Sequence, residues 1–206
     1  MIILAFDTCL DKTYAVLKKD NKIIASEVIE NTETKYHSAF LISTLQKILQ
    51  TNNTAPANID LIAVNSGPGS FTGIRACITV ARVMAQQLNC KAIGISSLEI
   101  LANTIPKNND VLVALDARKN KAYLRCDNEL KGAVEIEKVK TIIDTGKYKV
   151  ITDDKLQPIF GGKSYQQERY PIGEILADLA SEKINYCSGK WSEVLPLYIQ
   201  PPPVGI

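Results

Sequence analysis

Two aspartates in this 206-residue chain stand where apolar runs that predict strands come to an end. Asp7 follows the apolar run 1–6 and precedes Thr8, and Asp116 follows a run that begins at Val111. Two such turns facing each other are the skeleton of a cleft for phosphotransfer, in which carboxylates face a phosphate and its metal ion. Neither turn contains the glycines that would let phosphates approach the backbone. The sequence therefore does not exclude nucleotide binding, but it lacks the glycines that usually support it in such turns.

A glycine-rich turn at residues 67–73 joins a predicted strand to a predicted helix, a place where backbone N–H groups can bind an anion. It is not a Walker A loop, because its last glycine is followed by Ile74 and Arg75 instead of Lys and Ser or Thr. It is not a nucleophile elbow on Ser70, because both flanking glycines of that motif are missing. Two interpretations remain, a tight strand–helix connection capped by Ser70 or Thr72 and a degenerate phosphate loop. The candidate positions for such a loop are Asp7, Thr8, Gly67, Gly69, Ser70 and Asp116.

A metal site is not expected in this chain. His37 is the single histidine, and a two-histidine site on a helix would need a second one at i+3 or i+4, where the chain has Phe40 and Leu41. No spacing supports a Ser–His–Asp arrangement with Ser70. The five cysteines are scattered, without a C-x-x-C pair, which is typical of reduced and mostly buried thiols.

The elements that must position these residues follow from hydrophobic periodicity. Residues 1–104 predict the order β-β-β-α-β-α-β-α, and hence a mixed sheet with helices on its faces. The predicted strands are 2–6, 13–19, 22–30, 61–64 and 91–95, and the predicted helices are 37–50, 72–89 and one that opens at 96.

A polar stretch at 103–110 suggests a division of the chain. We predict an N-terminal lobe over 1–104, a smaller second lobe over 105–190 and an extended, Pro-rich tail over 191–206. In the second lobe we expect a hairpin (111–117 and 122–126), a strand near 149–152 and a helix over 172–186. The region 132–163 is short, charged and hard to assign.

The helix predicted at 72–89 has an apolar arc about twice the roughly 100° of a helix packed on one side. It must bury a second face, either beneath its own chain or in a partner. The interface candidates on this helix and on the helix at 37–50 are Ile42, Leu45, Leu49, Arg75, Cys77, Val80, Ala81 and Met84. A basic cluster on the second-lobe hairpin is either a solvated face or an RNA contact; it comprises Arg118, Lys119, Lys121 and Arg125, with Tyr123 among them.

Composition and charge give no sign of a nucleic-acid-binding, membrane-surface or secreted protein. A net charge of +2 and a pI near 8.2 are too mild to indicate nucleic-acid or membrane-surface binding by themselves. The apolar N-terminus lacks the basic flank and cleavage pattern of a signal peptide. We expect a cytoplasmic protein.

Several stretches together resemble the TsaB (YeaZ) family of bacterial tRNA threonylcarbamoyladenosine biosynthesis proteins. They are ILAFDT at 3–8, HS at 37–38, VNSGPGSFTGIR at 64–75, GISSLE at 94–99, LDAR at 115–118 and PLY at 196–198. The resemblance covers residues 1 to about 125, and then the tail. It implies an α/β fold of the actin/Hsp70/sugar-kinase (ASKHA, ribonuclease H-like) type, with two lobes of mixed sheets flanked by helices.

The resemblance also implies a role. The chain would be a non-catalytic scaffold for a TsaD-like paralogue, with a TsaE-like ATPase as a further partner and a homodimer when alone. The complex would install threonylcarbamoyl on adenosine 37 of tRNAs that read ANN codons, and any contact of this chain with tRNA would be indirect. Metal, ATP and threonylcarbamoyl-adenylate would then belong to the partner. The alternatives are an independent ATPase or phosphotransferase of the sugar-kinase type and a hydrolase.

Overall fold

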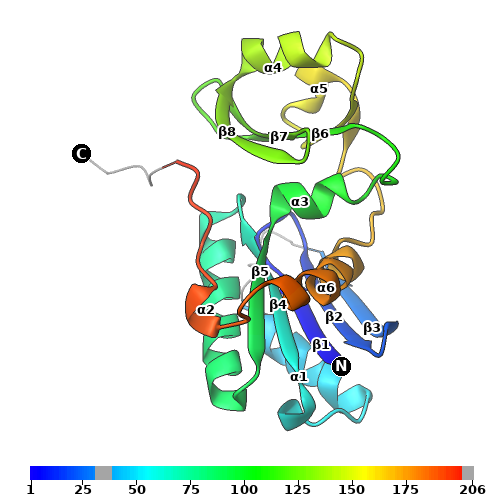
Figure 1. Cartoon of the computed structure of the whole chain (residues 1–206), viewed down its shortest axis with the longest axis vertical. Helices are drawn as coiled ribbons and strands as arrows, with labels where there is room; N and C mark the ends of the chain where they lie inside the picture. The colour runs from blue at the N-terminus through cyan, green and yellow to red at the C-terminus, as the bar shows by residue number, and fades with distance from the viewer. Residues whose placement is uncertain (31–38, 201–206) are drawn as a thin grey trace, which may run out of the picture. The chain divides into compact units, whose positions relative to one another are not determined.

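The computed structural model of the chain describes residues 1–30 and 39–200, which form two compact units (Figure 1). The first unit comprises Met1–Ser97 and Ile172–Leu197, and the second comprises Leu98–Pro171 together with the described residues that follow Leu197. Each unit contains one five-stranded sheet.

The sheet of the first unit has the strand order β3-β2-β1-β4-β5. Its strands are β1 (Ile2–Asp7), β2 (Thr13–Lys19), β3 (Lys22–Ile29), β4 (Leu61–Gly67) and β5 (Lys91–Ser96). The first three pair antiparallel, whereas β1, β4 and β5 pair in parallel, so the sheet is mixed, as the sequence predicts. The predicted order of elements for residues 1–104 is confirmed wherever the structure describes the chain.

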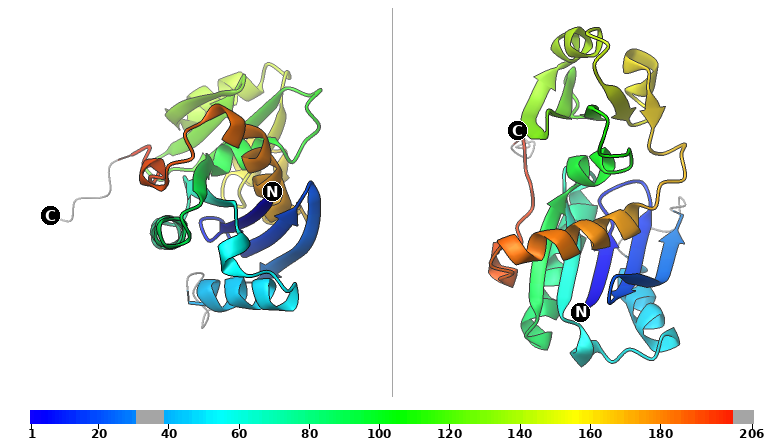
Figure 2. Two further views of the ribbon diagram at one scale, coloured as in Figure 1. Left: turned by 60° about the horizontal axis from the view of Figure 1, so that its bottom comes forward. Right: turned by 45° about the vertical axis from the view of Figure 1, so that its right-hand side comes forward.

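Helices cover both faces of this sheet (Figure 2). Helices α1 (Leu41–Thr51) and α2 (Phe71–Leu88) lie on one face, where their apolar residues pack with Leu4 and Phe6 of β1 in a single core. Helix α6 (Ile172–Lys183) crosses the other face. A short 3-10 helix, Pro56–Asn58, precedes β4.

The position of α6 differs from the prediction that residues 105–190 form the second lobe. The helix belongs to the first unit because its Gly173 packs directly on β2, with room for only a hydrogen between it and the side chains of Tyr14 and Val16. The chain therefore returns to the first unit, and the segment after α6 also stays there. It forms the 3-10 turns Ile184–Tyr186 and Trp191–Glu193, and Gly189 O accepts a hydrogen bond from Ala92 N of β5 at 2.9 Å.

The sheet of the second unit has the order β10-β9-β6-β7-β8, which repeats the topology of the first sheet when its strands are counted along the chain. Its strands are β6 (Val111–Asp116), β7 (Lys121–Cys126), β8 (Glu129–Glu135), β9 (Lys149–Thr152) and β10 (Lys163–Ser164). Helices α4 (Ile136–Ile143) and α5 (Gln157–Phe160) pack on one face of it, and α3 (Ser97–Ala102) lies at the junction of the units along the chain. The hairpin and β9 were predicted; β8, α4, α5 and β10 occupy the stretch that the sequence left unassigned.

Among residues 1–30 and 39–200, no helix combines the length and the apolar character that a membrane span requires.

Candidate functional site

The turn after β1 and the turn after β4 pack against each other at one end of the first sheet. We call them the β1 turn (residues 7–10) and the glycine turn (residues 67–73). Cys9 O accepts a hydrogen bond from Ser70 N at 2.8 Å. Ser70 is also the N-cap of α2, and its Oγ accepts from Gly73 N at 3.2 Å, as one of the predicted capping alternatives requires. The two turns are thus joined through the backbone.

The glycines of the glycine turn are required by this contact. A Cβ atom on Gly69 would lie 2.3 Å from Cys9 O, and one on Gly73 would lie 1.8 Å from Thr8 O. Real Cβ atoms do not approach oxygen so closely, so any larger residue would force the turns apart. Gly69 and Gly73 therefore bring the chain close to itself. This favours the tight connection over the degenerate phosphate loop.

Asp7 lies at the centre of the junction and is fully buried. Its carboxylate accepts hydrogen bonds from Cys9 N at 2.5 Å and from Asn65 Nδ2 at 2.9 Å. Asn65 Oδ1 in turn accepts from Gly67 N at 2.9 Å and from Ser97 Oγ at 2.8 Å. Burial raises the pKa of Asp7 to about 6, against the opposing effect of the hydrogen bonds from Asn65 and Cys9. The sequence analysis selected Asp7 as a candidate site residue but did not select Asn65. The only sign in the sequence that Asn65 belongs to the site was its position at the end of a predicted strand.

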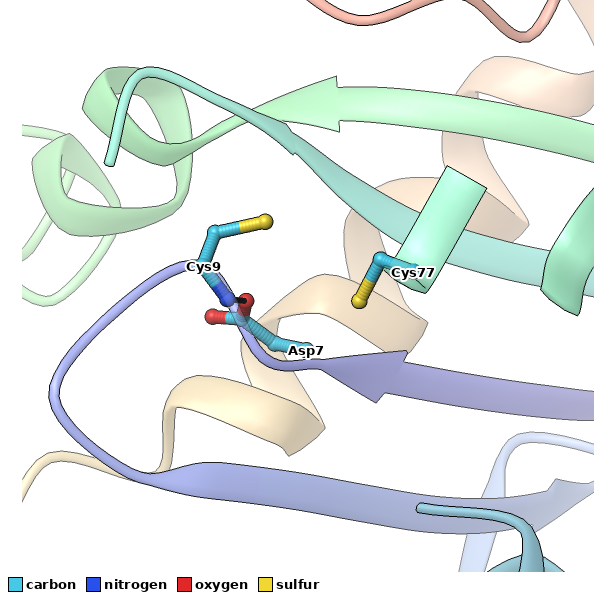
Figure 3. Close-up of side chains that lie close together, drawn as sticks. All are labelled: Asp7, Cys9 and Cys77. Carbon is cyan, nitrogen blue, oxygen red and sulfur yellow. Dashed lines mark hydrogen bonds between the residues drawn. The ribbon is translucent and has the colours of Figure 1, made fainter. Parts of the chain in front are cut away.

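Two cysteines far apart in the sequence meet Asp7 in this core (Figure 3). One ligand atom each from Asp7, Cys9 and Cys77 lies within 4.8 Å of the others, an arrangement that sequence spacing did not reveal. Each sulfur is already engaged: Cys9 Sγ donates to Asn65 O at 3.1 Å, and Cys77 Sγ accepts from Thr8 N at 3.1 Å.

This cluster is poorly suited to a metal ion. Metal binding needs a thiolate, whereas burial and the nearby groups Cys77 and Asp7 raise the pKa of the Cys9 thiol. Both carboxylate oxygens of Asp7 already accept hydrogen bonds from the chain. A bound ion would have to displace these contacts within a site that is closed to solvent.

Asp116, the second predicted phosphotransfer aspartate, lies in the other unit at the end of β6. Its Oδ1 accepts from Arg118 N and its Oδ2 from Lys155 Nζ, both at 2.9 Å. Burial of the carboxyl opposes ionisation, but these two donors hold its pKa below the usual value. The Arg118 contact closes the tight β6–β7 turn, and the Lys155 contact joins the end of β6 to the segment between β9 and α5. Of the basic cluster in this hairpin, Lys121 is paired with Glu135 at 3.1 Å.

The structure divides the eight predicted interface residues into two groups. Leu45, Leu49, Cys77 and Ala81 are buried in the core of the first unit and do not present a surface to a partner, which corrects the prediction for these four. They are buried because α1 and α2 turn these positions toward the sheet. Ile42 and Arg75 are exposed, and Val80 and Met84 are half-buried against the core.

Two further apolar residues of α2 face outward, and the sequence did not select them. Val83 is 53% exposed, and Phe71 is exposed with the Arg75 guanidinium 5.2 Å from its ring centre. Together with Ile42, which is 47% exposed, they define what we call the α1/α2 surface: Ile42, Phe71, Arg75, Val80 and Val83. His37 lies outside the described residues.

Comparison with known proteins shows which family this chain belongs to. A family model described as TsaD, tRNA N6-adenosine threonylcarbamoyltransferase, matches residues 22–148, which is more than half of the chain. The chain belongs to this family.

The chain is also similar to curated proteins that carry the name TsaB. It is 36% identical over 126 residues to "tRNA threonylcarbamoyladenosine biosynthesis protein TsaB" of Buchnera aphidicola subsp. Schizaphis graminum, 33% identical over 126 residues to the protein of that name in Escherichia coli, and 32% identical over 125 residues to that of Bacillus subtilis. These alignments cover 59–60% of this chain and 53–58% of the relatives, so the chain spans little more than half the length of the relatives it matches.

Two solved structures from Pseudomonas aeruginosa share the fold. One, titled YeaZ, has a TM-score of 0.76 at 23% identity and covers 96% of this chain and 99% of its own. The other, described as similar to peptidase YEAZ, has a TM-score of 0.79 at 22% identity, with 97% and 99% covered. They confirm the predicted α/β class with two mixed sheets flanked by helices.

Proposed function

We propose that this chain is a supporting subunit of the machinery that forms threonylcarbamoyladenosine in tRNA, and that it acts by binding a TsaD-like catalytic paralogue. Its TsaB relatives are named for this biosynthesis. Metal, ATP and the threonylcarbamoyl donor are then held by the partner, and this chain has no resident cofactor of its own. In this proposal the reaction takes place in the cytoplasm, on adenosine 37 of tRNAs that read ANN codons.

One observation carries the non-catalytic part of the proposal. Carbonyl oxygens of the β1 turn lie 1.8–2.3 Å from where Cβ atoms would stand on Gly73 and Gly69, so these glycines serve a contact of the chain with itself, which supports a role other than holding a phosphate. The carboxylates of Asp7 and Asp116, which a phosphotransfer enzyme would direct at a metal ion, accept hydrogen bonds from their own chain instead. This argues against an independent ATPase of the sugar-kinase type.

The α1/α2 surface is the partner site in this proposal. Val83 and Ile42 are large apolar side chains left about half exposed on helices whose other faces form the core. Exposed apolar side chains on a rigid helix are typical of protein interfaces, and Arg75 with Phe71 adds two residue types enriched there. The same surface can hold a second copy when the paralogue is absent, and a TsaE-like ATPase is a further member of the complex.

The test is complex formation with the TsaD-like protein of the same organism. Val83→Glu should leave the melting temperature of the chain within about 2 °C of wild type, because the side chain is exposed. It should weaken assembly more than ~10²-fold, since a carboxylate buried in an apolar interface loses hydration without a counter-charge. Lys47→Glu, on α1 and paired with Glu27 at the sheet edge, serves as the charge-change control that leaves assembly intact. Unchanged assembly of the Val83 variant would move the partner site elsewhere.

A further inference from the structure

The hairpin of β6 and β7 in the second unit carries a concentration of positive charge that the fold does not require. Residues 116–126 contain four cationic side chains and one carboxylate, whereas the whole chain has a net charge of only +2. The four are Arg118, Lys119, Lys121 and Arg125. The rest of the chain is therefore slightly acidic, and its positive charge is concentrated on this hairpin.

The side chains of β7 divide between the two faces of the second sheet. Ala122 and Leu124 belong to the core beneath α4 (Figure 1). Lys121, Tyr123 and Arg125 alternate with them, so they lie on the other face, and each is partly exposed. An aromatic ring therefore lies between two cationic residues that are about 13 Å apart along the strand.

Three of the four cationic side chains have no partner in the part of the chain that the structure describes. Lys121 pairs with Glu135 at 3.1 Å. The side chains of Arg118, Lys119 and Arg125 make no hydrogen bond or ion pair there, and Arg125 Nε is buried without an acceptor. A buried donor without an acceptor costs free energy, and a guanidinium is suited to phosphate. These three side chains can therefore bind an anionic partner without giving up a contact.

The turn between β6 and β7 places two of these cationic residues at unfavourable backbone positions. Arg118 and Lys119 have φ values of 59° and 49°, in the left-handed region that long side chains rarely adopt. The β2–β3 and β7–β8 turns fill their left-handed positions with Asp20–Asn21 and Asp127–Asn128, residue types that tolerate them. Arg and Lys therefore cost folding free energy that Asn would avoid, a pattern found at functional sites.

RNA has the chemistry that fits this combination of side chains. Phosphates bind Arg and Lys, and unstacked bases stack on Tyr rings and on the planes of Arg guanidinium groups. Tyr123 beside Arg125 offers both kinds of contact on one strand face. An acidic protein segment would pair with the cations as well, but it would gain less from an aromatic ring placed among them.

We propose that this chain contacts tRNA directly through the hairpin patch, which we define as Arg118, Lys119, Lys121, Tyr123 and Arg125. The cationic side chains bind phosphates, and Tyr123 stacks on an unpaired base. This differs from the expectation that any contact with tRNA is indirect. The inference rests on the proposed function only for the identity of the RNA. The hairpin patch belongs to the second unit and the α1/α2 surface to the first, so mutations can separate the two interactions.

The cationic side chains are tested by the binding of an unmodified, end-labelled tRNA transcript to the isolated full chain, measured by fluorescence anisotropy. Arg118→Asn combined with Lys119→Asn removes two charges and supplies the residue type that tolerates both backbone positions. Because each lost phosphate contact costs about 5–8-fold at 0.1 M salt, this variant should bind at least about tenfold more weakly. The slope of log K against log salt should become shallower by about 1.4–1.8. Its melting temperature should equal or exceed that of wild type.

Lys138→Gln combined with Lys140→Gln is the matched control. It removes the same charge from α4, which covers the other face of this sheet, and should leave binding within about twofold of wild type. Binding by the folded Asn variant that matches wild type would overturn the proposal. Equal weakening in the control, or no binding by the wild-type chain at about 50 mM salt, would overturn it too.

Substitutions at Tyr123 test the base contact. Stacking of one base contributes about fivefold or more to affinity, so Tyr123→Leu should weaken binding by at least that factor without changing the salt slope. Tyr123→Phe keeps the ring and should bind as wild type does. Equal binding by the two variants would refute the base contact. Competition by polyglutamate as effective as that of unlabelled tRNA, charge for charge, would identify the patch as a site for acidic protein and contradict the proposal.

These measurements need no paralogue, so their outcome is separate from that of the proposed function. Val83→Glu should bind tRNA as wild type does while losing assembly with the TsaD-like protein. The hairpin-patch variants should show the reverse behaviour in size-exclusion chromatography and anisotropy. Hairpin-patch variants that keep both assembly and tRNA binding would overturn this inference alone and leave the proposed function in place.

Discussion

Gly73→Ala is the substitution that most clearly separates a closed junction from a phosphate loop. In an ordinary helix, replacing Gly by Ala stabilises the protein by roughly 0.5–1 kcal/mol. At position 73 the new Cβ would lie 1.8 Å from Thr8 O, so the two backbones must separate by more than 1 Å to restore contact distance, taking ~3.2 Å as normal. That separation would also strain or break the hydrogen bond from Thr8 Oγ1 to Gly73 O, which is 2.8 Å long.

The expected cost follows from these contacts. Overpacking of a rigid interior costs about 1–3 kcal/mol, and the loss of a buried hydrogen bond adds about 1–3 kcal/mol. After subtracting the helix-propensity gain, we expect a net destabilisation of about 3 kcal/mol, or roughly 10 °C in melting temperature for a unit of this size. Trp191 is the single tryptophan and packs on the core of the first unit, so its fluorescence reports the unfolding of that unit.

Gly94→Ala provides the control in the same unit. Its Cβ would meet only the side chains of Ser66 and Val194, at 3.3 Å or more, and the loss should stay below about 1 kcal/mol. A Gly73→Ala chain that is as stable as wild type, or more stable, would refute the closed junction and restore the phosphate-loop interpretation.

Further predictions concern the buried cluster and the chemistry of the isolated chain. The pKa of the Asp7 carboxyl is about 6 in the folded chain and 3.8 in the unfolded chain, so the folded state binds this proton more tightly. The protonated carboxyl therefore contributes stability that is fully present below pH 4 and is lost as the pH rises through 6. The free energy of unfolding of Asp7→Asn minus that of wild type should therefore rise by up to about 3 kcal/mol between pH 4 and 7 in denaturant titrations; a pH-independent difference would contradict the raised pKa. Metal analysis after chelator-free purification should find no stoichiometric zinc or iron, and one tightly held ion per chain would show that Asp7, Cys9 and Cys77 do form a site. The purified chain should not hydrolyse ATP in a phosphate-release assay, and turnover that disappears in Asp116→Asn would restore the sugar-kinase alternative.

Much of the first unit could be predicted because its sequence pattern is local. Strand β2 alternates cleanly: Ala15 and Leu17 face α1, and Val16 faces α6, as a period of two requires. The second unit could be predicted only in part. Strand β10 has two residues and α5 has four, too few to produce a periodic signal.

The site was harder to predict because it depends on contacts between distant residues. Cys9 and Cys77 are 68 positions apart, and only the parallel pairing of β1 with β4, followed by α2, brings them together. The wide apolar arc of α2 was visible in the sequence, but the sequence did not show which part of the arc is buried in the core and which part is exposed. Which side becomes core depends on where the sheet lies, and the structure buries Cys77 and Ala81 while leaving Val83 outside.

The central claim is that this chain supports a catalytic partner and does not act alone. Omission experiments in a reconstituted reaction test it most directly: threonylcarbamoyladenosine formed on tRNA is measured with the TsaD-like protein, the TsaE-like ATPase and the threonylcarbamoyl donor, with and without this chain. We predict that modification requires the chain, that Val83→Glu abolishes it, and that Asp116→Asn, which alters a carboxylate directed at its own turn, leaves the rate within about twofold of wild type. Full modification without the chain, or its loss on Asp116→Asn in a folded variant, would contradict the account.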